Sequence, residues 1–419
     1  MLGAHKVETN MQVQTNRSNL APVTREATSF HALILLGTVI CSTLAPMIVG
    51  PVLPAMQEHF SEIPGIQTLV PLVVTAPMLV LGALAMIMGA ISDRLGRKRV
   101  LVYSLILYAV AGTAPLYLKS IYTIIASRAL VGVAEAAAMT VGTSLIGDYF
   151  TGARRDRYAS LQITVASTSA FIFNLVGGVL GSYGWRIPFI AYALPLLLAP
   201  LVQVYLWDPV RASNAAIEEH TVGDAEPEFK PRLLTLICLV GFAVGLVFMI
   251  VPVHLSYMMV QVGVNSTSAI GVAYALNSIG VIIGTLMFGW LFAARLSVSR
   301  QFAVGMLICA AGFACMGTAD SFVLLTLGGV INGVGSGVIL PALVSWGLRS
   351  LPFSRRGFGT GAFTATQFIG YFCSPLIVMP MVVHWGSRFV VLQGWGVALA
   401  VLSAITFAGI PARRTLKVG

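Results

Sequence analysis

The sequence predicts an all-α membrane protein with twelve transmembrane helices in two pseudo-symmetric six-helix halves. Three observations predict this fold: the overall hydropathy, the recurrence of apolar runs, and a repeat that relates the two halves of the chain. The mean hydropathy of the 419 residues is +0.88, and 57% of them are hydrophobic. A soluble domain has too little interior to hide so much apolar surface, so we expect most of the chain to lie in lipid.

Apolar runs of the length that a helix needs to cross a hydrocarbon core, about 20 residues, recur along the chain. We expect helices near residues 32–56, 66–90, 100–118, 121–147, 158–181, 187–207, 233–258, 267–293, 302–318, 321–348, 357–382 and 388–410. A long polar segment rich in acidic residues separates the first six runs from the last six. This pattern predicts a membrane domain that is divided in the middle.

The chain is therefore predicted to have five parts. These are an N-terminal tail (1–30), a first six-helix half (31–207), a central loop (208–232), a second six-helix half (233–411) and a C-terminal tail (412–419). The first thirty residues are polar and lack the apolar core of a signal peptide. We expect the first helix to remain in the mature protein.

Basic residues gather on one side of the predicted membrane. The loops after the second, fourth, eighth and tenth helices contain Arg94, Arg97, Lys98, Arg99, Arg154, Arg155, Arg157, Arg295, Arg300, Arg349, Arg355 and Arg356. The loops on the other side contain only Lys119, Arg186 and Arg388. By the positive-inside rule, both termini are expected to be cytoplasmic, in the cell (inner) membrane. The same asymmetry explains most of the net charge of +10, so we expect no nucleic-acid partner.

The sequence lacks the usual signatures of metal, nucleotide and catalytic sites. All five cysteines fall inside predicted spans, and none has metal-ligand spacing with another Cys or His. We find no phosphate-binding loop, zinc signature or serine-nucleophile motif. We therefore expect no metal, no cofactor and no enzymatic activity.

A repeat relates the two halves at an offset of 201 positions. At this offset "DRLGRKR" from Asp93 aligns with "ARLSVSR" from Ala294, Arg154-Arg155 with Arg355-Arg356, and Gly132 with Gly333. Three separate landmarks agree on one offset, which indicates a duplicated six-helix unit. Membrane proteins built from repeated halves place the substrate site between them and work by rocking one half against the other.

Several motifs resemble those of the major facilitator superfamily and, within it, the twelve-helix drug/proton antiporter group. The stretch "GAISDRLGRKRV" resembles the loop 2–3 signature, matched by Gly89, Asp93, Arg94, Gly96, Arg97, Lys98 and Arg99. "LAPMIVGPVLP" from Leu44 is similar to the helix-1 motif, with Ala45 where a Gly is usual. "RALVG" from Arg128 resembles the helix-4 motif that places an Arg inside the membrane. The resemblance covers essentially the whole chain and implies the major facilitator fold.

One motif of the group is incomplete. Antiporters of this group typically have Gly-Pro-x-x-Gly-Gly on helix 5, whereas this chain reads "FNLVGG" from Phe173 to Gly178. Because the motif is associated with export, the missing Gly-Pro pair leaves the direction of transport open.

The charged stretch after the second span is a candidate cytoplasmic gate. Asp93 ends that span, and the repeat places the start of helix 11 nearby, where free N–H groups and the helix dipole favour a carboxylate. Such a contact would join the halves and close the cytoplasmic side; the alternative is that these charges only fix the topology. We also expect Arg97 to bond Asp148. The candidate gate comprises Gly89, Asp93, Arg94, Gly96, Arg97 and Asp148.

Arg128 and Glu135 are the two ionisable residues well inside a predicted span. They lie seven positions apart on helix 4, which puts them within about 20° of one face and about 10 Å apart. A charge at that depth costs at least about 2.5 kcal/mol, so such residues usually face a cavity and have a function. We expect Glu135 to carry the coupling proton and Arg128 to assist it and face the cavity. The alternatives are a structural ion pair, or a Glu that stays protonated and bonds a neighbouring helix.

Neutral polar residues within the spans are further candidates for the substrate cavity. They are Asn174, Asn277, Asn332, Gln367 and Tyr371. Interhelical hydrogen bonds use the same residue types, so this alternative stays open for each of them.

The function that these observations favour is proton-coupled efflux of small apolar or amphipathic compounds by alternating access. The alternative is a proton-coupled importer of a small organic solute or anion, with Arg128 as its counter-ion. A non-transporting receptor would need a large soluble domain, which the sequence lacks. The expected partners are a small-molecule substrate, protons and the lipid bilayer, and we expect a monomer.

Overall fold

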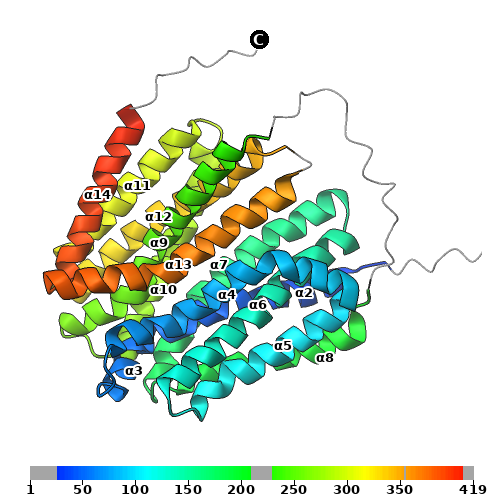
Figure 1. Ribbon diagram of the computed structural model, residues 1–419, viewed down its shortest axis with the longest axis horizontal. Helices are drawn as coiled ribbons and strands as arrows, with labels where there is room; N and C mark the ends of the chain where they lie inside the picture. Colours follow the sequence, from blue (N-terminus) through cyan, green and yellow to red (C-terminus); the bar gives the residue numbers. More distant parts are fainter. Residues whose placement is uncertain (1–25, 209–228, 353–354, 409–419) are drawn as a thin grey trace, which may run out of the picture.

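The computed structural model describes residues 26–208, 229–352 and 355–408 (Figure 1). Within these ranges the chain is helical, contains no strand, and has twelve helices long and apolar enough to cross a membrane. This confirms the predicted fold class. Most of the predicted N-terminal tail and central loop, and all of the predicted C-terminal tail, lie outside the described residues.

The first six spans contain two that are divided. They are α2 (Ser29–Val49) with η1 (Gly50–Val52) and α3 (Leu53–His59), α4 (Ile66–Leu95), α5 (Arg97–Thr113) with η2 (Ala114–Leu116), α6 (Ile121–Tyr149), α7 (Gly152–Gly181), and η3 (Ile187–Ala193) with α8 (Pro195–Tyr205). Prolines stand in the first turns of η1, α3, η3 and α8. Because proline has no N–H and cannot continue a helix, it begins a new segment at each of these points.

The last six spans are mostly single helices. They are α9 (Pro231–Gln261), α10 (Thr267–Met287) with the π-helical turn η5 (Phe288–Phe292), α11 (Val298–Gly317), α12 (Phe322–Ser350), α13 (Arg356–Trp385) and α14 (Arg388–Ala408). Successive spans run in opposite directions. We call the side that holds Arg97, Asp148 and Asp208 the Asp208 side, and the opposite side the Arg388 side.

Several helices extend beyond the predicted spans on the Asp208 side. α5 begins at Arg97 and α7 at Gly152, ahead of the predicted positions near 100 and 158. Hydropathy marks the part of a helix that lies in lipid, whereas the helix itself continues through the basic residues outside it. Gly96 alone separates α4 from α5, with a φ of 93° that favours glycine.

The helices form two groups, α2–α8 and α9–α14, which lie side by side in Figure 1. Each group has its own large hydrophobic core. The groups also repeat one another, because α6 and α12 both have 29 residues and equivalent glycines in contact with a neighbour. A Cβ on Gly132 would lie 2.5 Å from the Pro77 carbonyl oxygen, and one on Gly333 would lie 2.5 Å from that of Asn277. Both contacts are possible only for glycine and pair corresponding helices of the two groups.

Candidate functional site

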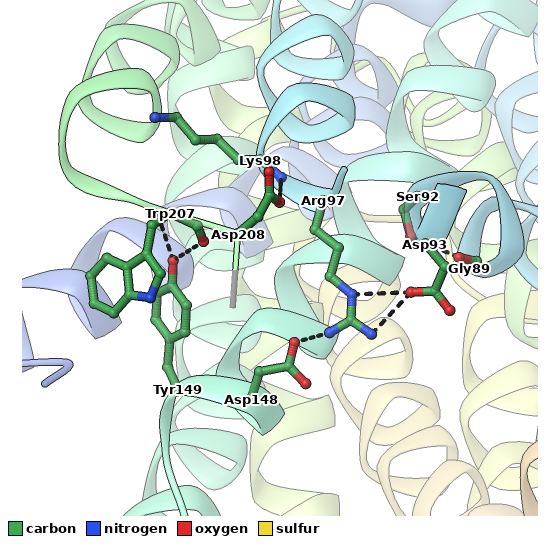
Figure 2. A network of polar contacts seen from close by, with 9 residues as sticks. All are labelled: Gly89, Ser92, Asp93, Arg97, Lys98, Asp148, Tyr149, Trp207 and Asp208. Carbon is green, nitrogen blue, oxygen red and sulfur yellow. Dashed lines mark hydrogen bonds and ion pairs between the residues drawn. The ribbon is translucent and has the colours of Figure 1, made fainter. Parts of the chain in front are cut away.

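A network of polar contacts joins four helices on the Asp208 side (Figure 2). Arg97, in the first turn of α5, lies between two carboxylates. Its Nε and Nη2 donate to Asp93 Oδ1 at 3.3 and 3.1 Å, and its Nη1 donates to Asp148 Oδ2. The predicted bond between Arg97 and Asp148 is therefore present. Arg97 ties the ends of α4 and α6 to the start of α5.

Asp208 extends this network to the end of the sixth span. Its Oδ1 accepts a hydrogen bond of 2.8 Å from the Lys98 backbone N–H, at the start of α5. A Cβ on Gly96 would lie 3.1 Å from Asp208 Oδ2, so glycine leaves room for this carboxylate. A carboxylate at a helix N-terminus satisfies free N–H groups and complements the dipole. The sequence analysis placed Asp208 in the central loop and missed this role.

Tyr149 and Trp207 form a second connection in the same place. The Tyr149 hydroxyl donates to the Trp207 carbonyl at 2.6 Å and accepts from its N–H at 2.9 Å, and the two rings stack at 4.5 Å. On α4, the Ser92 hydroxyl donates to the Gly89 carbonyl at 2.8 Å, and the Arg94 side chain is exposed. These contacts hold the ends of α4, α5, α6 and α8 together within one half.

The predicted latch between Asp93 and the first turn of α13 remains a prediction. The surroundings of Arg356 and Gly357, which begin that helix, lie outside what the structure describes. The neighbouring Arg355 places its guanidinium over the Phe229 ring at 5.7 Å.

Arg97→Gln is expected to lower the free energy of unfolding by about 1–2 kcal/mol. Hydrogen bonds to charged groups contribute about 1.5–3 kcal/mol, and partial exposure reduces this value. Thermal unfolding of the purified protein measures the change. The control is Arg94→Gln, which removes a neighbouring exposed guanidinium. Equal effects of the two substitutions would contradict a special role for Arg97.

Arg128 lies deep within the first half and is 0% exposed. Its Nη2 donates to the carbonyls of Ala111 and Gly112, both at 2.7 Å, near the end of α5. The guanidinium stands over the Tyr192 ring at 4.6 Å and the Phe189 ring at 5.1 Å. A cation at a helix C-terminus and over aromatic faces is well stabilised. The structure thus directs Arg128 toward α5 and η3 rather than toward the second half.

Arg128→Ala is expected to lower the free energy of unfolding by about 3 kcal/mol, because it empties a packed site and removes a donor from two carbonyls. Arg128→Lys keeps the charge without the planar fork, so we expect an intermediate loss. The midpoint of thermal unfolding measures both. Lys119→Ala, at an exposed base, is the control. An Arg128→Ala protein as stable as this control would show that the contacts of the guanidinium do not stabilise the fold.

Glu135 is 1% exposed, and its Oε2 has no hydrogen-bond partner among the described residues. The carboxyl group is close enough to Cys41, Tyr108 and Tyr192 for its charge to act on them. The same two tyrosines interact electrostatically with Arg128. Glu135 and Arg128 thus share a pair of tyrosines.

The tyrosine pair connects three spans around Glu135. The rings of Tyr108 and Tyr192 stack at 5.6 Å. The Tyr108 hydroxyl donates to the Cys41 carbonyl at 2.6 Å, and the Tyr192 hydroxyl donates to the Ala45 carbonyl at 3.0 Å. The sequence analysis missed both tyrosines, because tyrosine in an apolar run reads as packing.

The predicted cavity residues are not gathered in one place. Asn174 Nδ2 donates to Ser278 Oγ at 3.1 Å, a bond between the halves, and Gln367 Nε2 donates to the Tyr371 hydroxyl at 2.9 Å. Tyr371 packs against the core of the first half. Asn277 and Asn332 instead donate to backbone carbonyls of neighbouring helices in their own half. For these two, the structure shows the interhelical hydrogen bonds that the sequence left as an alternative.

The halves are in backbone contact near the Arg388 side. A Cβ on Gly178 of α7 would lie 2.8 Å from Gly271 Cα of α10. The buried residues of α7 begin at Ser169, so the first half of this helix, toward the Asp208 side, is not covered. A second contact joins α4 to α13, where a Cβ on Gly82 would lie 2.9 Å from the Ala365 carbonyl oxygen. The halves are thus closely packed along α7 only toward the Arg388 side.

Comparison with known proteins identifies transporters of the same architecture. The chain is 27% identical to the 3-(3-hydroxy-phenyl)propionate transporter of Escherichia coli over 307 residues, which cover 71% of this chain and 73% of that protein. It is also 27% identical to the bacillibactin exporter of Bacillus subtilis over 350 residues, 80% of this chain and 85% of that one.

A solved structure shares the fold. A bacterial homolog of the human lysosomal transporter Spinster, in an inward-facing and occupied conformation, superposes with a TM-score of 0.73 at 15% sequence identity, covering 91% of this chain and 95% of that chain. The sequence profile of the Major Facilitator Superfamily matches residues 35–263 and again 237–417. Together with the twelve spans, these matches show a multi-pass integral membrane protein of a transporter family. The chain belongs to the Major Facilitator Superfamily.

Proposed function

We propose that the protein is a proton-coupled secondary transporter that exports small, mostly apolar compounds by alternating access. The observation that carries this proposal is Glu135, a buried carboxyl group whose Oε2 has no hydrogen-bond partner among the described residues. We further propose that it acts as a monomer in the cell (inner) membrane, with both termini in the cytoplasm.

Glu135 supports proton coupling because a charged carboxylate without a partner is costly to bury, and taking up a proton removes that cost. A rearrangement of α2, α5 and η3 around the tyrosine pair changes the surroundings of the carboxyl group. We propose that export releases substrate outside as Glu135 takes up a proton, which it then discharges inside. Arg128 is a positioning residue in this scheme, since it holds Tyr192 and the end of α5 beside Glu135.

The helices that face the opposite half support an apolar or neutral substrate. In α2, α4, α7, α9, α10 and α13, no Asp, Glu, Lys or Arg stands outside the two turns at the Asp208-side end. The contacts between the halves involve neutral groups such as Asn174, Ser278 and Phe368. A charged substrate would find no counter-ion on these surfaces, whereas an apolar body needs none.

Import of a small organic solute or anion is the second candidate. "FNLVGG" favours it, because this stretch lacks the Gly-Pro pair that the resemblance associates with export. The relatives include the transporter named for 3-(3-hydroxy-phenyl)propionate, an organic anion, as well as the bacillibactin exporter.

Vesicles of known orientation distinguish the two candidates. A thermal-shift screen of purified protein first selects compounds that bind, since a ligand of the folded state raises its stability. The best compound is then added to inverted and right-side-out vesicles that contain a pH-sensitive dye. Export by antiport predicts that, in inverted vesicles, the compound enters as protons leave. Co-movement of compound and protons in one direction would contradict antiport and support import.

A further inference from the structure

A second group of polar side chains without partners lies on the Arg388 side, away from Glu135. It surrounds a cavity of about 520 Å³ between the two halves. The first half contributes residues such as Pro51, Gln57 and Ile66, and the second half contributes Tyr257, Thr267 and Arg388. A cavity of this volume fits a small organic molecule.

The walls of this cavity hold several unsatisfied polar atoms. Within the described part of the chain, eleven buried side-chain N or O atoms lack a hydrogen-bond partner. Four of them belong to residues that line this one cavity: Gln57 Oε1, Tyr257 Oη, Thr267 Oγ1 and Arg388 Nε. Tyr257 is only 5% exposed, so its hydroxyl has little access to bulk water. Because buried polar groups are normally paired, this concentration points to a bound partner.

Arg388 gives the cavity its charge. It is half-buried at the first position of α14, and its guanidinium stands over the Tyr257 ring at 4.6 Å. Both ion pairs found among the described residues involve Arg97, so Arg388 forms none there. Glu58 also lines the cavity, but it is exposed. A half-buried guanidinium without an acid beside it favours an anion.

We propose that this cavity binds a small organic carboxylate with an apolar body and one hydroxyl group. The carboxylate accepts hydrogen bonds from the Arg388 guanidinium and the Tyr257 hydroxyl, and the ligand's hydroxyl donates to Gln57 Oε1. The apolar body packs on Pro51, Pro54 and Ile66. This site is separate from Glu135 and from the neutral surfaces of the proposed transport path. Because the ligand touches both halves, it favours the state in which they are together on this side.

Binding of para-hydroxybenzoate to the full-length protein tests this proposal. The protein is held in nanodiscs of phosphatidylcholine, and binding is measured by calorimetry. Arg388→Gln is expected to weaken binding about 10–100-fold, the loss typical of a hydrogen bond to a charged group. The uncharged para-hydroxybenzamide should bind more weakly by a similar factor, and benzoate by about 3–10-fold, because it leaves Gln57 Oε1 unpaired.

Arg186→Gln is the matched control. Arg186 also lies on the Arg388 side and stands over an aromatic ring, that of Trp185 at 4.8 Å. Its Nη2, however, donates to the Leu118 carbonyl, and the residue does not line this cavity. We expect unchanged affinity for this variant. Tyr257→Phe provides a second test that keeps the ring under Arg388 and should weaken binding about 3–10-fold.

Three results would overturn the proposal. They are wild-type affinity in Arg388→Gln, equal affinity for the carboxylate and the amide, and no detectable binding of the carboxylate to the wild-type protein. A lipid phosphate is the competing anion, so the measurement is repeated in nanodiscs that contain phosphatidylglycerol and with inorganic phosphate as competitor. Loss of para-hydroxybenzoate binding in either arm would assign Arg388 to a phosphate and contradict the carboxylate assignment.

Discussion

Glu135→Gln is expected to abolish uphill transport driven by a pH gradient, while substrate binding remains detectable and becomes insensitive to pH. The amide has the shape of the protonated carboxyl group but cannot exchange a proton. Glu135 is the acid buried at the centre of α6, with Oε2 unpaired among the described residues. The other acids that the structure describes lie at helix ends or in loops.

Accumulation of the selected compound in proteoliposomes with an imposed pH gradient measures this effect. Counterflow without a gradient is the companion assay, and we expect the Gln variant to retain it, because exchange does not require net proton movement. Asp320→Asn, at an exposed acid between α11 and α12, is the matched control. A Gln variant that still builds a substrate gradient would place the coupling site elsewhere, with Asp148 and His254 as the next residues to test.

Gly178→Val is expected to abolish transport by preventing the halves from closing on the Arg388 side. A Cβ on Gly178 would lie 2.7 Å from the Thr267 carbonyl oxygen and 2.8 Å from Gly271 Cα. These atoms belong to the backbone of α10, so a rotamer change cannot relieve the overlap. Closure on this side is one of the two states that alternating access requires.

Reactivity of a cysteine introduced at Gln57 reports the state of the Gly178→Val protein. Gln57 lines the cavity between the halves, so a water-soluble maleimide should label Gln57→Cys faster when Gly178 is also replaced. The matched control is Gly394→Val, because a Cβ on Gly394 of α14 meets nothing within 4 Å. Transport and labelling rates equal to those of the control would show that the contact between α7 and α10 is not needed for the cycle.

The spans and the repeat were readable from the sequence because both depend on local apolar runs and on landmarks at a fixed offset. The equivalent contacts of Gly132 and Gly333 confirm the repeat at atomic detail. The bond between Arg97 and Asp148 was also predictable, since both residues stand where helices end on the same side. Asp208 was not, because its partner is a backbone N–H of α5, which no residue type signals.

Arg128 shows where sequence reasoning reaches its limit. A charge inside a span must be satisfied, but the sequence does not say whether by a cavity, an acid or backbone carbonyls. In the structure, the partners of Arg128 are carbonyls at the end of α5 and two aromatic rings. The same ambiguity applied to Asn277 and Asn332, whose hydrogen bonds join helices of one half. Side chains that bond to backbone leave no pattern in the partner's sequence.

Proton release on substrate binding tests the role of Glu135 most directly. The selected compound is added to purified protein in a weakly buffered solution, and the change in pH is recorded with a soluble indicator. If Glu135 exchanges its proton for substrate, the wild-type protein releases protons and Glu135→Gln releases none, although the compound still binds. Equal proton release by the two proteins would contradict the proposal that Glu135 carries the coupled proton.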